Sequence, residues 1–110
     1  MRRIGIRHLD NRRTLTPRQY ARKPWTFGTT AAVMELPEGG DEVSLRIAIY
    51  HHQLVIAVHA RNVRVSDVCA RFGFGRDVWH EVLGGHRWPG ETVYVALVDA
   101  LAHGQQQLSR

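Results

Sequence analysis

Four polar side chains stand at helical spacing in the second half of the sequence. Arg76 and His80 are four positions apart, as are Asp77 and Glu81, so both pairs share one side of a helix. Arginine donates two parallel hydrogen bonds to guanine, and a carboxylate accepts one from the amino group of cytosine. The set is therefore suited to contact with nucleic-acid bases, and an ordinary solvated helix face is the alternative interpretation.

No spacing typical of a catalytic or metal site accompanies these residues. The sequence has no phosphate-binding glycine loop and no serine elbow. Cys69 is the only cysteine, which excludes an internal disulfide and a cysteine metal site. His51 and His52 are adjacent and diverge on a helix, while His59 follows His52 two turns later, which is not a zinc spacing. We expect no enzymatic activity, no metal, no cofactor and no small-molecule ligand.

The elements that must position the four residues are short helices divided by glycines. Ser66 and Asp67 begin a helix that ends at Gly73, where glycine adopts a left-handed conformation at little cost. A second helix runs over residues 76–83 and ends at Gly84 and Gly85. A third, amphipathic helix is predicted over residues 91–103, closed by Gly104, with residues 105–110 as a disordered tail.

Small and apolar residues stand where two steeply crossed helices need them. Cys69 is small and lies at the expected crossing, which favours inert packing over a redox role, and Gly73 follows four positions later. Apolar side chains then fill the angle between the helices, and Trp79 is read as one of them rather than as a base-stacking platform. These signals predict a helix-turn-helix. The remaining apolar positions are Val68, Phe72, Phe74 and Val82.

The run VRVSDVCARFGFGRDVWHEVLGGHRWPGETVYVALVDAL, residues 63–101, resembles the lambda-repressor-like regulators of the Cro and xenobiotic-response-element type. The resemblance implies that the helix over residues 76–84 lies in the major groove of double-stranded DNA. It departs from the family pattern at Gly75, where a serine or threonine cap is common. The implied base contacts are Arg76, Asp77, His80 and Glu81, and the implied phosphate contacts are Arg64, Ser66, His86 and Arg87.

The stretch before this unit has two interpretations. Residues 43–49 alternate as a strand would, and such a strand could pair with residues 32–36 across a turn at 37–41. Helical spacing also fits, and we favour one helix over residues 44–61. The fold class is then mainly α, a helix-turn-helix bundle of about four helices in a domain spanning 43–104, with a short β-hairpin before it as an option.

Charge is distributed unevenly along the 110 residues. Residues 1–23 carry eight basic residues and one acid, a net +7, whereas the remainder has seven arginines and nine acids, a net −2. We interpret 1–23 as a basic, flexible arm for a polyanion, and a mobile solubilising tail is the alternative. Residues 24–42 are interpreted as a docking segment in which Trp25 and Phe27 meet the body. The arm arginines that could enter the minor groove are Arg2, Arg3, Arg12 and Arg13.

The expected function is sequence-specific DNA binding by a small regulator of the repressor kind. A single helix-turn-helix covers half a site, so a homodimer is expected, with its contact surface in residues 24–50. We expect a cytoplasmic, bacterial or phage-encoded protein, because no apolar run reaches membrane-spanning length and no signal peptide is evident. A protein-interaction module whose arm binds an acidic partner is the alternative. Trp88, before Pro89, is expected to pack under the last helix.

Overall fold

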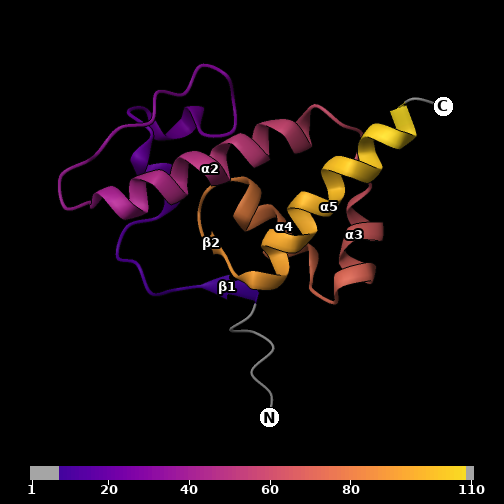
Figure 1. Ribbon diagram of the computed structural model, residues 1–110. Coiled ribbons are helices and arrows are strands. Elements are labelled where there is room, and N and C mark those ends of the chain that lie inside the picture. Colours follow the sequence, from indigo (N-terminus) through magenta and orange to yellow (C-terminus); the bar gives the residue numbers. More distant parts are fainter. Residues whose placement is uncertain (1–7, 109–110) are drawn as a thin grey trace, which may run out of the picture.

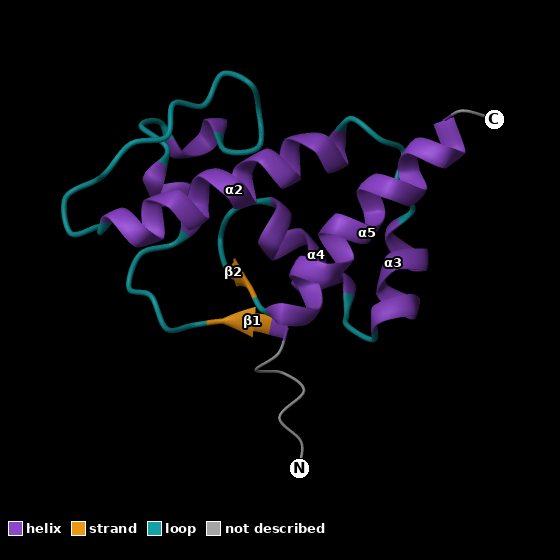
Figure 2. Cartoon of the chain, viewed as in Figure 1, coloured by secondary structure: helices purple, strands orange, loops and turns teal. Residues whose placement is uncertain are grey.

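The computed structural model describes residues 8–108, with side chains for residues 8–102. This part of the chain has four α-helices, α2 (Glu42–His59), α3 (Val65–Phe72), α4 (Arg76–Leu83) and α5 (Glu91–Leu108). Figure 1 shows α2 and α5 converging towards one end of the molecule. Figure 2 shows that helices predominate after residue 41 and loops before it. The predicted mainly α bundle of about four helices is confirmed.

The ambiguous segment is helical. Asp41 caps α2, because its carboxylate accepts hydrogen bonds from the Ser44 backbone N–H at 2.9 Å and from the Ser44 hydroxyl at 2.7 Å. Such a cap satisfies donors at the helix start that have no partner within the helix. The favoured helix over 44–61 is confirmed, with both ends shifted by two residues to Glu42 and His59. The strand alternative is wrong.

The optional hairpin across the turn is also wrong, although the turn at 37–41 is present. The Gly40 N–H donates to the Pro37 carbonyl at 3.0 Å. Met34, however, forms its backbone bridge with Ala21 and not with a residue of α2. Burial of α2 against the core is the physical reason, since seven of its positions are buried at helical spacing.

The turn between α3 and α4 has the geometry that its residues predict. Gly73 adopts φ +77°, in the left-handed region, and its N–H donates to the Cys69 carbonyl at 2.8 Å. Cys69 is buried. Phe74 stacks on Trp79, with ring centroids 6.0 Å apart and an interplanar angle of 20°. Both aromatic rings lie in the main core with Val68 and Val82, so the angle between α3 and α4 is fixed by packing.

The structure corrects the interpretation of residues 8–23, called here the N-terminal segment, as part of a flexible arm. β1 (Leu9–Asp10) pairs antiparallel with β2 (Trp88–Pro89). The Arg18 N–H donates to the Gly85 carbonyl at 2.9 Å. A 3-10 helix, η1 (Pro17–Tyr20), buries Tyr20. The segment is thus built into the body along the residues that follow α4, and residues 1–7 lie outside the described part.

Trp88 is packed by this segment and by α2, not under the last helix as expected. Its indole N–H donates to the Leu15 carbonyl at 2.7 Å, and its ring meets Tyr20 edge-on at 6.0 Å. Trp88, Tyr20 and Ala48 of α2 form a second, smaller core cluster. The N-terminal segment is therefore held by aromatic burial as well as by backbone hydrogen bonds.

Two further boundaries differ from expectation. α5 continues through Gly104 to Leu108, so residues 105–108 are not a disordered tail; one helical glycine costs only about 1 kcal/mol. In the segment from 24 to 42, which contains the 3-10 helix η2 (Pro24–Thr26), Phe27 is buried but Trp25 is 71% exposed. None of the helices within residues 8–108 is long and apolar enough to cross a membrane.

Candidate nucleic-acid interface

The four polar residues predicted to contact bases are all exposed on α4. Arg76 and His80 form one row along the helix, and Asp77 and Glu81 form a second row beside it. Gly75 precedes the helix and provides no side-chain cap. The structure therefore brings these four residues together on one accessible face, while Trp79 and Val82 hold the opposite face in the core.

In the row of Asp77 and Glu81, the carboxylate of Glu81 is partly neutralised by an arginine. Glu81 lies 3.6 Å from the Arg87 guanidinium, and Arg87 donates a hydrogen bond to the Asn11 side-chain carbonyl at 3.1 Å. Asn11 belongs to the N-terminal segment, so this contact joins residues 76 positions apart. Arg87, predicted as a phosphate contact, is exposed but is already oriented by these two partners.

The row of Arg76 and His80 is continued by residues from two other parts of the chain. His86 folds back so that its ring atom Cδ2 lies 2.8 Å from the place that a Cβ on Gly84 would occupy. Arg18 donates from Nη1 to Nε2 of His86 at 2.6 Å. His86 was predicted as a phosphate contact, whereas Arg18 was missed, because nothing in its local sequence indicates its position beside α4.

The other predicted phosphate contacts lie at the start of α3. Arg64 is the residue preceding the helix, and Ser66 is in its first turn. Both are exposed. The Arg64 guanidinium lies 3.9 Å from the Asp67 carboxylate, with both side chains largely exposed, at 77% and 65%. An exposed pair of this kind is weak, so Arg64 remains accessible to an anion.

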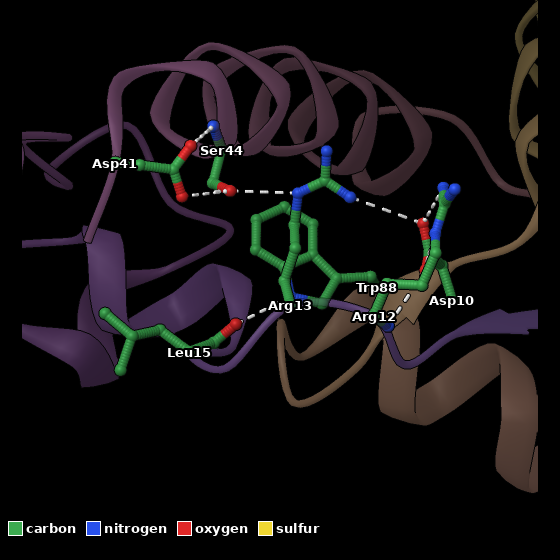
Figure 3. Close-up of polar contacts among 7 residues, drawn as sticks. All are labelled: Asp10, Arg12, Arg13, Leu15, Asp41, Ser44 and Trp88. Carbon is green, nitrogen blue, oxygen red and sulfur yellow. Dashed lines mark hydrogen bonds and ion pairs between the residues drawn. The ribbon is translucent and has the colours of Figure 1, made fainter. Parts of the chain in front are cut away.

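The predicted role of Arg13 in a mobile arm is wrong (Figure 3). Its guanidinium donates to the Ser44 hydroxyl at 2.9 Å and lies 5.5 Å from the centre of the Trp88 ring. Only 22% of the side chain is exposed. Arg13 therefore joins the N-terminal segment to the start of α2, where Ser44 is in turn held by Asp41.

Arg12 belongs to the same packed segment rather than to a free arm, because it follows the paired strand β1. It donates to both carboxylate oxygens of Asp10, at 2.8 and 2.7 Å, as Figure 3 shows. The hydrogen bond from the Arg12 side chain lowers the pKa of Asp10 to about 2. The Arg12 side chain is 82% exposed, unlike that of Arg13. Arg2 and Arg3 lie outside the described residues.

Cys69 and the histidine pair have core environments. Burial raises the pKa of the Cys69 thiol, which opposes thiolate formation. Burial also lowers the pKa of His51 to about 4 and that of His52 below its usual value. Within the described residues, no three side chains from His, Cys, Asp and Glu are grouped so that they could hold a metal ion.

Comparison of the chain with protein-family models, curated proteins and solved structures finds no match. The likeness to lambda-repressor-like regulators consequently rests on residues 63–101 themselves. What can be argued about function comes from the surface of α4 and from the residues around it.

Proposed function

We propose that the protein is a non-enzymatic, sequence-specific DNA-binding regulator that places α4 in the major groove. The observation that carries this proposal is the exposure of Arg76, Asp77, His80 and Glu81 on one face of a short helix whose other face is buried. A recognition helix needs this division, because its outward side chains contact base edges while its inward ones fix its angle.

Contacts with the phosphate backbone of the DNA would flank α4 on the side of α3. Arg64 and Ser66 at the start of α3 are exposed and can donate to phosphate oxygens. The ring of His8 packs on Phe74 in the turn before α4, with centroids 5.7 Å apart. His8 therefore lies beside the turn that precedes α4. Minor-groove contact by Arg2 and Arg3 is part of the same proposal.

A second copy of this chain is the proposed partner, since one helix-turn-helix contacts one half-site. A groove of about 550 Å³ between α2 and α5 is lined by Tyr50, Tyr94, Val95, Val98 and Asp99. Val95 and Val98 are about half exposed, at 53% and 49%. Antiparallel pairing of two α5 helices sets Val95 of each copy against Val98 of the other, so one patch serves both copies. Of the expected dimer region, 24–50, only Tyr50 lines this groove.

Selection of bound fragments from random duplex DNA, followed by a salt titration on the selected duplex, tests the proposal. We expect enrichment of a palindromic site, and a log–log fall of affinity with salt of about −0.9 per phosphate contact. Such a protein would act in the cytoplasm of a bacterium, encoded there or by a phage. Failure to enrich any sequence, with no duplex binding at about 50 mM salt, would overturn the proposal.

A further inference from the structure

The row of Arg76 and His80 on α4, called here the basic row, extends beyond the C-terminal end of the helix. Arg76, His80 and position 84 are spaced by four and share a face. Position 84 is glycine, and a Cβ there would lie 2.8 Å from the ring of His86 and 3.3 Å from the His80 carbonyl oxygen. The imidazole of His86 thus occupies the place that a side chain at position 84 would take.

Arg18 stands at the far end of this row and is held by three contacts. Its backbone N–H donates to the Gly85 carbonyl at 2.9 Å, and its Nη2 donates to the Pro24 carbonyl at 3.1 Å. Its Nη1 donates to His86 Nε2 at 2.6 Å. The guanidinium is therefore oriented before any ligand arrives, which reduces the entropy lost on binding.

The charge environment of Arg18 differs from that of several other arginines. Arg12, Arg22 and Arg87 each lie within 4.0 Å of a carboxylate. Among the described residues, no carboxylate lies within that distance of Arg18 or of Arg76. Both ends of the basic row consequently keep an uncompensated positive charge, and this arrangement favours an external anion.

We propose that Arg18, oriented by His86, binds a DNA backbone phosphate at the C-terminal end of α4. This inference rests on the proposed function. Eight residues of helix separate Arg76 from Gly84, a rise of about 12 Å, and the major groove is about 12 Å wide. With Arg76 against base edges, Arg18 reaches the phosphates that border the groove. The N-terminal segment then provides a DNA contact that the helix-turn-helix itself lacks.

The test compares Arg18→Gln with the wild type on the selected duplex and on random duplex. Glutamine can still donate to His86 or to the Pro24 carbonyl but has no charge. We expect affinity to fall about tenfold on both duplexes and the log–log salt slope to become less steep by about 0.9. Arg22→Gln is the matched control, because Arg22 is exposed on the same segment and pairs with Glu35 at 3.1 Å.

The outcomes separate this inference from the proposed function. If the wild type binds no duplex, the proposed function itself fails. If the wild type binds and Arg18→Gln keeps its salt slope, the phosphate contact is wrong, whatever happens to affinity. Arg18→Lys provides the second variant: it retains the charge, so the salt slope should return to that of the wild type. Thermal unfolding of each variant verifies that the N-terminal segment stays folded.

Discussion

The imidazole of His51 donates a hydrogen bond from Nε2 to the carbonyl oxygen of Val82 at 2.9 Å. His51 lies in the middle of α2 and is fully buried, while Val82 is in the last turn of α4. The contact therefore joins α2 directly to α4, the proposed recognition helix. Nδ1 of His51 has no hydrogen-bond partner within the described structure, so its protonation would place an unsatisfied charge in the interior.

This relationship predicts a loss of stability in mild acid. Burial lowers the pKa of folded His51 from 6.5 to about 4, so the unfolded chain binds a proton first as pH falls. Stability from neutral His51 is complete above about pH 6.5 and declines towards pH 4, by about 3 kcal/mol in total. Denaturant unfolding between pH 7 and pH 4 measures it. His51→Gln should flatten this dependence relative to the wild type, whereas His59→Gln, at an exposed position of α2, should not.

Arg76→Ala tests base contact by α4. We expect a loss of about 1–3 kcal/mol on the selected DNA site and relaxed discrimination at one base pair, because a bidentate contact with guanine would be lost. Binding to each single-base variant of the site measures this. Equal weakening on selected and random duplexes would instead make Arg76 a phosphate contact only.

Trp88 and Trp25 provide a contrast in stability. Trp88→Ala should cost about 3–5 kcal/mol, because it removes a buried ring together with the partner of the Leu15 carbonyl. Trp25→Ala should change the unfolding free energy by less than about 0.5 kcal/mol, since Trp25 is 71% exposed. Chemical denaturation measures both. A small effect at Trp88 would contradict the packing of the N-terminal segment against it.

Alanine substitutions at Gly73 and Gly85 distinguish the cost of backbone strain from the cost of steric overlap. Both have positive φ, at 77° and 74°. A Cβ at Gly73 meets nothing within 4 Å, so Gly73→Ala should cost only the left-handed backbone, about 1–2 kcal/mol. A Cβ at Gly85 would lie 2.7 Å from the buried ring of Phe27. Gly85→Ala should therefore be the more destabilising variant in thermal unfolding, and the reverse order would contradict this packing.

Val98→Asp tests the proposed dimer. In the proposed dimer a carboxylate at position 98 would be buried against Val95 of the other copy without a partner for its charge, which would oppose pairing. We expect sedimentation equilibrium to show a monomer for the variant and a dimer for the wild type. Val33→Asp is the control, because Val33 is similarly exposed, at 47%, but lies outside the groove. A wild-type monomer at all concentrations would contradict the proposal.

Local signals made the helix-turn-helix predictable. Cys69, Gly73 and Trp79 each have a role that depends on residues only a few positions away, so spacing alone predicts their burial or backbone conformation. The secondary structure of residues 43–49 was ambiguous because alternating and helical periods coincide there. Burial against the core favours the helix, α2.

The N-terminal segment could not be predicted in this way. Arg18 meets His86, Trp88 meets the Leu15 carbonyl and Arg87 meets Asn11 across separations of 68 to 76 residues. No sustained period marks a segment that is held by a two-residue strand, a 3-10 turn and single hydrogen bonds. A high density of arginine predicted solvent exposure, but the Arg13 guanidinium forms a hydrogen bond with Ser44 and an ion pair with Asp10 inside the fold.

The pairing of β1 with β2 has a consequence for synthesis on the ribosome. Leu9 and Asp10 emerge early, but their partners Pro89 and Trp88 are added almost eighty residues later. Until then Tyr20 has no Trp88 to cover it, and the nascent N-terminal segment is open to proteases and chaperones. A chain released before residue 88 would lack this protection, so resistance to proteolysis between residues 8 and 23 reports that synthesis has passed Trp88 and Pro89.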